Sequence, residues 1–370
     1  MNTNNKIAIY LPSLRGGGAE RVMVTLANGF AECGHSVDLV LAHATGPYLS
    51  EVAPAVHVED LGCTRVATSL LGLMRYLRDV RPEAILSAMG HANVIALLAV
   101  TLAQVSTRVV VSERNDSSVE STHARGLRSR LIHQCCRLLY RKAHHIHAVS
   151  AGVADAVAAQ LSIPRERIQV VYNPVDTDRI LELSHISVDY PWLQENSTPL
   201  IAAAGRLTRQ KDFMTLIRAF AKVRMSRNLR LVIMGEGELR AALEAEIIRL
   251  DLKGDVLLPG FIENPFAVMR RARLFVLSSA WEGLPNVLIQ AMACGTPVVA
   301  TDCPSGPAEI LEHGKWGRLL PVGDVDALAE AIAMTLNDKH PPDVTQRAAY
   351  FSIDRAVTGY LRLLQVESQQ

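Results

Sequence analysis

The stretch 281–311 combines a carboxylate, turn residues and a helix in an order that could bind an anionic ligand. Glu282 is followed by a glycine and a proline, and residues 286–294 then have a helical pattern. Residues 298–301 (VVAT) predict a short buried strand that leads into a second turn-rich segment. Open α/β sheets bind ligands beyond their strand ends, and the free N–H groups of a helix N-terminus suit a diphosphate. A plain helix cap followed by an ordinary βα unit is the alternative interpretation.

The glycine run 16–18 is a second candidate site, between a strand pattern at 6–11 and a helical pattern at 22–33. Glycines at a helix start let the backbone approach a diphosphate closely. The run is G-x-G-x-x-R, so it lacks the complete dinucleotide fingerprint, and no clear acidic residue closes the second strand. A phosphate loop and a plain tight turn therefore both stay open.

Strand and helix patterns alternate along the chain in two series. The first series of strand patterns lies at 6–11, 35–41, 84–87, 109–112, 146–149 and 168–171. The second lies at 200–204, 230–234, 256–258, 274–277 and 298–301. This alternation predicts the α/β class with a doubly wound parallel sheet in each half, so we expect two Rossmann-like domains.

The length of 370 residues also favours two domains, because it exceeds the size of a single hydrophobic core. We expect an N-terminal domain at residues 1–178, a linker at 179–199, a C-terminal domain at 200–350 and a helix-bearing segment at 351–370.

Composition excludes several classes of protein. The net charge of +1 creates no overall field that would attract nucleic acid. The six cysteines show no C-x-x-C spacing, which favours a reducing cytoplasm over a disulfide framework or a zinc site. No signal peptide is expected, and the apolar run 94–105 is shorter than the roughly 20 residues of a membrane-spanning helix. We expect a cytoplasmic protein.

Two of these segments resemble the donor-site motifs of retaining GT-B glycosyltransferases of family four. Residues 281–291 resemble the pattern E-G-x-P-x-x-x-x-E-A, and residues 204–212 (AGRLTRQKD) resemble the loop G-R-L-x-x-x-K. The matching positions of the first motif are Glu282, Gly283, Pro285 and Ala291, with Gln290 in place of the second Glu. The resemblance extends over nearly the whole chain. It implies a GT-B fold of two Rossmann-like domains that face each other across a cleft, with the last helix crossing back to the first domain.

The resemblance also implies roles for single residues. Arg206 and Lys211 would bind the nucleotide diphosphate and stabilise the charge that develops on it as it leaves. Glu282 would accept hydrogen bonds from hydroxyls of the donor sugar. Gln290 stands where the family's Glu grips the ribose, and a neutral amide would do so more weakly. The other donor-binding candidates are Gly17, Gly18, Gly283, Leu284, Pro285 and Asn286.

The end of the strand pattern at 109–112 supplies the acceptor-side candidates Glu113, Arg114 and Asn115. Many relatives carry His at the position of Arg114, so this chain departs from the family there. Arg114 could bind a phosphate or an acceptor anion, or the cluster could be a set of surface salt bridges.

A basic segment at residues 121–143 contains six cations and no acidic residue, interleaved with leucines. Such a helix can lie on an anionic membrane or contact a diphosphate-linked acceptor. A solvated helix packed through its leucines is the alternative. The membrane-facing candidates are Arg125, Arg128, Arg130, Arg137, Arg141 and Lys142.

The N-terminal loop GGGAERVMVTLANGF is similar to that of family members that extend polyprenyl-diphosphate-linked glycans, N-acetylgalactosaminyltransferases among them. That similarity implies a UDP-hexose or UDP-N-acetylhexosamine donor and a sugar acceptor on a polyprenyl diphosphate. It also implies peripheral contact with the inner face of the cytoplasmic membrane, in the synthesis of a bacterial surface polysaccharide such as O-antigen.

Neither a metal nor another cofactor is expected. The two D-x-D triplets, at 176–178 and 324–326, are interpreted as turn or cap residues. Three alternatives stay open: a GT-B nucleotide-sugar epimerase, a non-catalytic nucleotide-sugar-binding protein, which Gln290 and Arg114 suggest, and a nicotinamide-dependent dehydrogenase. A nicotinamide-dependent dehydrogenase is disfavoured by the incomplete fingerprint.

Overall fold

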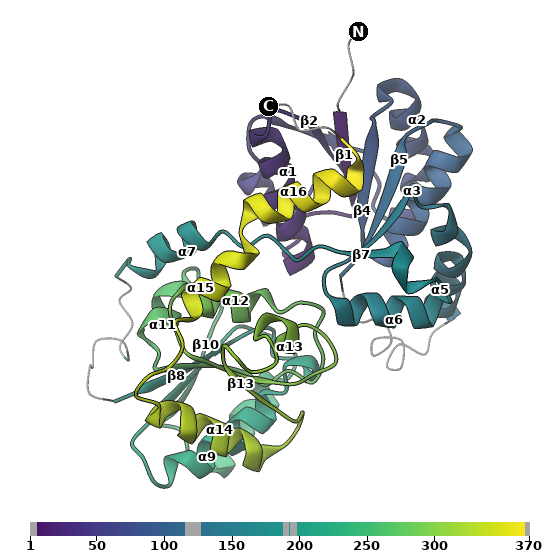
Figure 1. Cartoon of the computed structure of the whole chain (residues 1–370). Helices are drawn as coiled ribbons and strands as arrows, with labels where there is room; N and C mark the ends of the chain where they lie inside the picture. Colours follow the sequence, from purple (N-terminus) through teal and green to yellow (C-terminus); the bar gives the residue numbers. More distant parts are fainter. Residues whose placement is uncertain (1–5, 115–126, 188–191, 193–197, 367–370) are drawn as a thin grey trace. The chain divides into compact units, whose positions relative to one another are not determined.

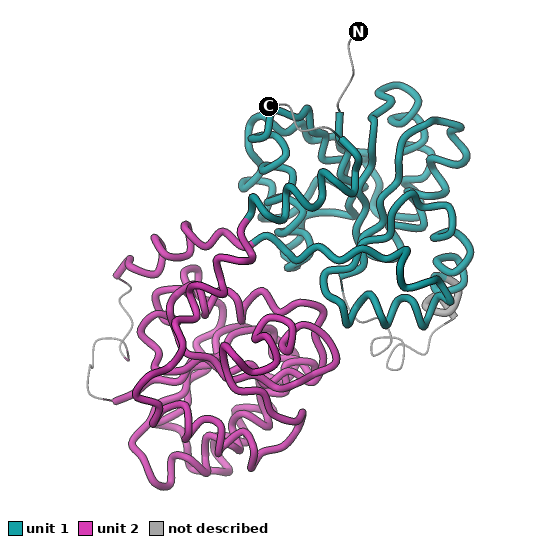
Figure 2. Tube along the Cα trace, in the orientation of Figure 1, with its two compact units in different colours: residues 1–174, 353–370 teal, residues 175–352 magenta. Residues whose placement is uncertain are grey.

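The computed structural model describes residues 6–114, 127–187, 192 and 198–366. Its contacts divide the chain into two compact units (Figure 2). The first unit combines residues 1–174 with 353–370, and the second is the single stretch 175–352.

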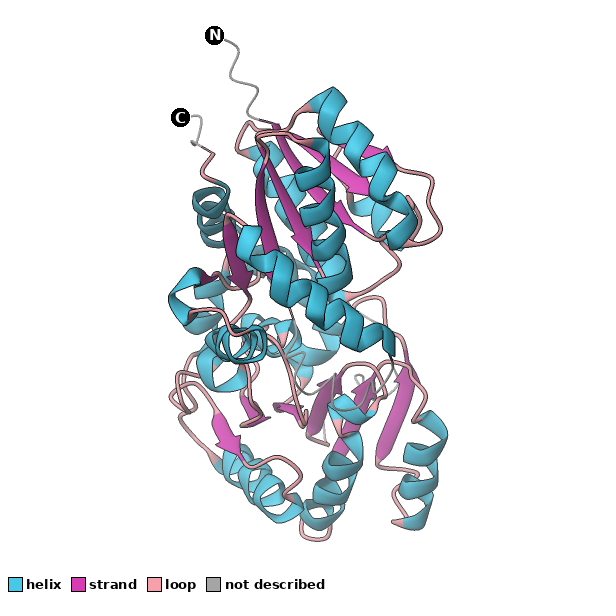
Figure 3. Cartoon of the chain, turned by 90° about the vertical axis from the view of Figure 1, so that its right-hand side faces the viewer, coloured by secondary structure: helices cyan, strands magenta, loops and turns pink. Residues whose placement is uncertain are grey.

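The first unit contains a seven-stranded parallel sheet in the order β3-β2-β1-β4-β5-β6-β7 (Figure 1). Its strands are β1 Lys6–Leu11, β2 Ser36–Leu41, β3 Val56–Asp60, β4 Ala84–Ala88, β5 Arg108–Glu113, β6 His145–Ala148 and β7 Ile168–Val170. Its α-helices are α1 Gly18–Glu32, α2 Leu70–Val80, α3 Gly90–Ala103, α5 Leu127–Leu139, α6 Ala151–Leu161 and α16 Ile353–Leu364. The central strands are buried on both faces because helices cover each side of the sheet, as Figure 3 shows.

Helix α16 completes the core of the first unit, although it lies at the far end of the chain. Val357 and Tyr360 belong to the same buried cluster as the apolar residues of β1 and α1. Gly29 of α1 permits this packing, since a Cβ atom there would lie 2.6 Å from Cγ2 of Val357.

The second unit contains a six-stranded parallel sheet in the order β10-β9-β8-β11-β12-β13. Its strands are β8 Leu200–Ala204, β9 Arg230–Met234, β10 Val256–Gly260, β11 Leu274–Leu277, β12 Val298–Thr301 and β13 Arg318–Leu320. Its α-helices are α7 Thr177–Ser184, α9 Phe213–Arg224, α10 Arg240–Arg249, α11 Pro265–Arg271, α12 Asn286–Ala293, α13 Pro307–Ile310, α14 Val325–Asn337 and α15 Val344–Ala348. The two doubly wound parallel sheets confirm the predicted fold class.

The expected domain limit at residue 178 falls inside α7. This helix packs against α11 and α12 of the second unit, and Asn264 Nδ2 donates a hydrogen bond to the Leu183 carbonyl at 2.8 Å. The second unit therefore begins at Val175.

Strand order in the second sheet reverses direction between β8 and β11. Strands β9 and β10 lie on one side of β8. Strands β11, β12 and β13, which follow later in the sequence, lie on its other side. Such a switch point leaves the loops after the two central strands free to diverge and form a ligand site. The loops after β8 and β11 are the two segments that the motifs single out.

Candidate active site

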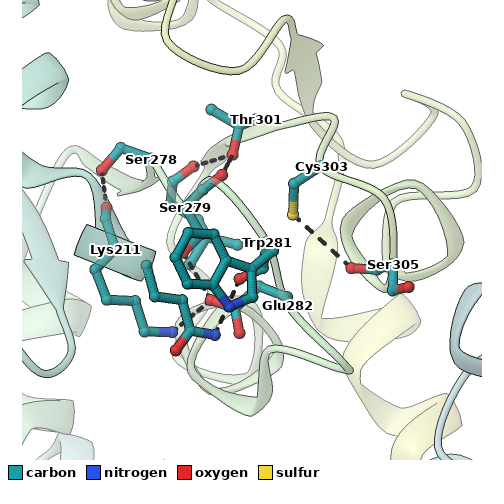
Figure 4. A network of polar contacts seen from close by, with 10 residues as sticks. Lys211, Ser278, Ser279, Trp281, Glu282, Thr301, Cys303 and Ser305 are labelled. Atoms are coloured by element: carbon teal, nitrogen blue, oxygen red, sulfur yellow. Dashed lines mark hydrogen bonds and ion pairs between the residues drawn. The ribbon is translucent and has the colours of Figure 1, made fainter. Parts of the chain in front are cut away.

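Three hydrogen bonds join the loops that follow β8 and β11. Ser278 Oγ donates to the Lys211 carbonyl at 2.8 Å, and the Ala280 N–H donates to the Gln210 carbonyl at 2.8 Å. Gln210 Nε2 in turn donates to the Trp281 carbonyl at 3.0 Å (Figure 4). The two loops therefore form one rigid base at the switch point of the second sheet.

A buried ion pair lies on this base. Lys211 Nζ pairs with Oε1 of Glu282, and Ser279 Oγ donates to the same oxygen at 2.6 Å (Figure 4). The side chains are only 14% exposed for Lys211 and 7% for Glu282. Two donors on the carboxylate offset the cost of burying its charge, so the site presents a fixed anion beside a fixed cation.

The end of β12 and the loop after it lie next to this ion pair. Thr301 Oγ1 donates to the Ser279 carbonyl at 2.5 Å. Burial, reinforced by the Glu282 carboxylate, raises the pKa of the Cys303 thiol to about 12. The thiol is therefore neutral at physiological pH and adds no charge next to Glu282.

Glycines allow the strand-end loops to approach one another through their backbones. A Cβ atom at Gly235, after β9, would lie 2.0 Å from the Gly205 carbonyl oxygen. A Cβ atom at Gly306, after β12, would lie 2.5 Å from Cδ of Pro285. Both glycines also have positive φ, of 136° and 93°, which few other residues adopt. The G-x-G turn after β9 thus has a packing role.

Arg206 lies on the same loop as Lys211 and has an exposed side chain. This side chain makes no hydrogen bond or ion pair with any residue that the structure describes. Helix α12 begins at Asn286, directly after its N-cap residue Pro285, whose side chain makes no capping hydrogen bond. A cation and a helix N-terminus thus lie on the same two loops as the ion pair, and both favour an anionic ligand. Gln290 lies half-buried on the second turn of that helix.

In the first unit, a carboxylate occupies the glycine loop. The N–H groups of Gly16 and Gly17 donate to Oε2 of Glu20 at 2.7 and 2.9 Å. Gly17 is the N-cap of α1, and Gly18 is its exposed first residue. The backbone donors expected to meet donor phosphates are therefore able to bind an anion, and in this structure the anion is Glu20.

Glu113 ends β5 and accepts hydrogen bonds from two neighbouring elements. Tyr140 OH donates to Oε1 of Glu113, and Asn93 Nδ2 donates to it at 3.2 Å. Burial, then the Glu113 charge, raises the pKa of Tyr140 well above its ordinary value. Tyr140 and Asn93 carry no local sequence signal for this contact, because they come from two different helical segments far from Glu113 in the chain.

Arg114 is buried and has partners from distant parts of the first unit. Its Nη2 donates to Asn173 Oδ1 at 2.5 Å, and its Nη1 lies 3.4 Å from both Ser112 Oγ and Tyr360 OH. His147 also bonds Ser112, at 2.8 Å, and burial, with a smaller effect of Arg114, lowers the pKa of His147 to about 3. This geometry favours a structural role for Arg114, and its expected contact with an acceptor stays a prediction.

In the described part of the basic segment, Leu127–Leu139 forms α5 and Tyr140–Lys142 forms a 3₁₀ turn. Cys136 and Tyr140 face the interior, whereas Arg137, Arg141 and Lys142 are exposed together with Leu138, which is 69% exposed. Arg128 and Arg130 lie on the helix backbone, but the structure does not describe their side chains, and Arg125 and Asn115 lie outside the described residues.

Both D-x-D triplets begin with a helix cap, as predicted. Asp176 accepts from the Arg179 N–H at the start of α7, and Asp324 accepts from two N–H groups at the start of α14. Among the described residues, no three His, Cys, Asp or Glu side chains gather as a metal site. No helix in the described part of the chain is long and apolar enough to span a membrane.

Two Rossmann-like sheets, with cations and a carboxylate at the switch point of the second, define the class of GT-B glycosyltransferases. Residues 16–179 match the family description "Glycosyltransferase Family 4", and residues 198–338 match "Glycosyl transferases group 1". The chain belongs to this family of group 1, family 4 glycosyltransferases, as predicted from its motifs.

Relatives and solved structures agree with this assignment. The chain is 30% identical over 347 residues to the N-acetylgalactosamine-N,N'-diacetylbacillosaminyl-diphospho-undecaprenol 4-alpha-N-acetylgalactosaminyltransferase of Campylobacter jejuni, covering 90% of each chain. It is 26% identical to the lipopolysaccharide core biosynthesis glycosyltransferase LpsE of Rhizobium meliloti, covering 87% of this chain and 86% of LpsE. The structure of Anabaena HepE in complex with UDP and glucose matches its fold with a TM-score of 0.80 at 21% identity, covering 98% of this chain and 99% of HepE.

Proposed function

We propose that this protein is a retaining enzyme that transfers a hexose or an N-acetylhexosamine from a UDP-linked donor to a sugar acceptor on a polyprenyl diphosphate. The observation that carries the proposal is the Lys211–Glu282 pair at the switch point of the second sheet, with the exposed Arg206 on the same loop. This arrangement offers two cations to a diphosphate and one carboxylate to neutral hydroxyls. The names of the Campylobacter relative and of the HepE complex support the acceptor and the nucleotide.

In the proposed reaction, the bond between the anomeric carbon and a diphosphate oxygen breaks. The acceptor hydroxyl oxygen bonds to the same face of that carbon, UDP leaves with the electron pair, and a phosphate oxygen of UDP takes the acceptor proton. Arg206 and Lys211 stabilise the negative charge that grows on the leaving diphosphate, and electrostatic stabilisation of this kind usually contributes most to the rate enhancement. Glu282 orients the donor by accepting hydrogen bonds from its sugar hydroxyls, and Gln290 contacts the ribose.

The exposed cations at the end of α5 and on the following 3₁₀ turn support a location at the inner surface of the cytoplasmic membrane. Arg137, Arg141 and Lys142 point to solvent beside Leu138. Each such cation adds about 1 kcal/mol of attraction near an anionic bilayer. Sedimentation with vesicles containing phosphatidylglycerol should bring down the wild type, and the variant with serine at all three cationic positions should stay largely in solution.

The test of the proposed function is an assay of nucleotide release. Purified protein is incubated with UDP-N-acetylgalactosamine, UDP-N-acetylglucosamine, UDP-glucose or GDP-mannose, with and without an undecaprenyl-diphosphate-linked N-acetylhexosamine or a soluble sugar. Release of UDP that depends on the lipid-linked acceptor is expected. Lys211→Ala and Glu282→Ala should each reduce it by about 100-fold. Lys222→Ala is the matched control, because Lys222 forms an exposed ion pair with Asp326 in the same unit.

Other outcomes would overturn defined parts of the proposal. Transfer to the soluble sugar alone would exclude the lipid-linked acceptor. Conversion of a sugar nucleotide without any acceptor would identify an epimerase. Binding without turnover, with turnover created by Gln290→Glu and Arg114→His together, would identify a non-catalytic binding protein.

A further inference from the structure

We infer that Ser279 is a positioning residue for Glu282, which it holds so that Oε2 is the oxygen that meets the hydroxyl groups of the donor sugar. The inference rests on the function proposed above and deepens it. It assigns a purpose to a buried hydroxyl that lies three residues before the carboxylate and donates a hydrogen bond to it (Figure 4).

The bonds to the carboxylate are divided unequally. Lys211 Nζ and Ser279 Oγ both bond to Oε1 of Glu282. Within the described part of the chain, no residue bonds to Oε2. A carboxylate oxygen has two lone pairs, so Oε1 is saturated by its two donors and Oε2 keeps its full capacity to accept. An unequal division of this kind gives the carboxylate one anchored side and one side for a ligand.

Ser279 is rigid enough to act as an anchor. It is fully buried, and its carbonyl accepts the Thr301 hydroxyl at 2.5 Å. The next residue, Ala280, donates its N–H to the Gln210 carbonyl at 2.8 Å. The hydroxyl of Ser278 points to a different acceptor, the Lys211 carbonyl. The backbone on both sides of Ser279 is thus held by other elements, and its hydroxyl has Glu282 as its acceptor.

A second anchor is needed because Lys211 alone would hold the carboxylate loosely. An ammonium group on a four-carbon stem is a point charge with freely rotating donors, so it fixes a distance but little orientation. A diphosphate would also compete for the same ammonium group. The neutral Ser279 hydroxyl is not attracted to the diphosphate in this way. It therefore keeps its hydrogen bond to Oε1 when a donor binds, and Oε2 stays oriented toward the sugar.

The test compares ligands that differ only in the sugar. Isothermal calorimetry is carried out with UDP, UDP-N-acetylgalactosamine and UDP-glucose on the wild type and on Ser279→Ala. The variant keeps the backbone carbonyl that Thr301 bonds and the Lys211 pair, so it should fold. UDP affinity should stay unchanged, while the additional affinity of the preferred UDP-sugar over UDP should fall by about tenfold, the loss expected for one hydrogen bond to a charged group.

Thr296→Val is the matched control. Like Ser279, Thr296 has a buried hydroxyl that donates a hydrogen bond, in its case to the Met269 carbonyl at 2.7 Å. Unlike Ser279, it precedes the amino end of β12, away from the site. It should leave both affinities unchanged. An analogue lacking the sugar hydroxyl that meets Oε2 should bind the wild type and Ser279→Ala with equal affinity, because the contact is already lost.

Equal weakening of UDP and UDP-sugar by Ser279→Ala would overturn the inference, since it would indicate a merely structural hydroxyl. Unchanged binding of both ligands would overturn it as well. A wild type that binds neither UDP nor either UDP-sugar would instead refute the proposed function, so the two failures are distinguishable.

Discussion

Lys211 and Glu282 form a buried ion pair across 71 residues of sequence, because the strands that precede them, β8 and β11, are neighbours in the second sheet. Lys211→Met would leave a carboxylate uncompensated, so the free energy of unfolding should fall by about 3 kcal/mol. Glu282→Gln added to it should restore part of that loss in a double-mutant cycle. Urea denaturation measures both effects.

The control for this pair is Lys222→Met, which removes a cation from an exposed ion pair with Asp326. It should cost less than about 1 kcal/mol. If the two methionine variants have equal free energies of unfolding, the buried Lys211–Glu282 pair contributes no more to stability than the exposed pair.

Glu20 should compete with phosphate for the glycine loop. Its carboxylate takes the N–H groups of Gly16 and Gly17, where the family resemblance expects donor phosphates. Glu20→Gln removes the charge, so UDP affinity should rise by roughly threefold to tenfold, while α1 loses about 0.5 kcal/mol of dipole stabilisation. Calorimetry with UDP measures the first effect. The control is Glu32→Gln, at the other end of α1, which should leave the UDP affinity unchanged. A lower UDP affinity in Glu20→Gln would contradict competition between Glu20 and phosphate.

Gln290→Glu should strengthen nucleotide binding through the ribose. Charge-assisted hydrogen bonds are about twice as strong as neutral ones, so UDP affinity should rise by about tenfold. The gain should disappear with 2′-deoxy-UDP, which lacks one of the hydroxyls that the carboxylate would hold. Calorimetry with both nucleotides is the measurement. An equal gain for both would point to a general charge effect instead of ribose contact.

Gly235→Ala should damage the second unit as well as the site. The new Cβ would lie 2.0 Å from the Gly205 carbonyl oxygen, in a backbone with φ of 136°. Strain and overpacking together should lower the free energy of unfolding by about 2–4 kcal/mol. Gly254→Ala is the control, because a Cβ there meets no atom within 4 Å. Thermal and urea unfolding measure the stability of both variants. Similar stability of Gly235→Ala and Gly254→Ala would show that the loops after β8 and β9 can move apart without cost.

Glu246 should make the second unit sensitive to acid. Hydrogen bonds from Arg249, and then from Arg218, lower the pKa of this carboxyl from 4.5 to about 2. The depressed pKa means that the ionised carboxylate stabilises the fold above about pH 4.5, and that this contribution is lost as the pH falls toward 2. Urea unfolding should show Glu246→Gln less stable than wild type at pH 7, with a difference that shrinks below pH 4.5. Glu244→Gln, an exposed neighbour, should follow the wild type throughout.

Apolar runs predicted most of the fold, and two of the four edge strands, β3 and β13, escaped prediction. β1, β8, β9, β11 and β12 have the predicted limits, because central parallel strands are continuous apolar segments. β3 (VHVED) contains three polar residues and β13 (RLL) is only three residues long, so neither forms a continuous apolar run. The other two edge strands, β7 and β10, were predicted because each lies in a mainly apolar run, so the local apolar content made the difference.

The charged residues of the candidate site could be predicted from the sequence, because they belong to recognisable motifs. Arg206, Lys211 and Glu282 lie at the switch point that the motifs implied. The contacts of Ser279 and Glu20 depend on side-chain direction, which spacing alone does not specify. The burial of Arg114 depends on Asn173 and Tyr360, which are 59 and 246 residues away. Long-range packing of this kind leaves no local trace in a sequence.

The use of both ends of the chain in the first unit sets an order of folding during synthesis. The second unit is one continuous stretch, so it has every residue it needs once residue 352 has left the ribosome. The first unit begins earlier in the sequence, but its core lacks α16 until that helix emerges. Until then, the apolar surface of α1 that contacts Val357 at Gly29 stays exposed. The part of the protein that is translated first is therefore completed last, and a ribosome that stalls before residue 353 leaves a nascent chain for chaperones to hold.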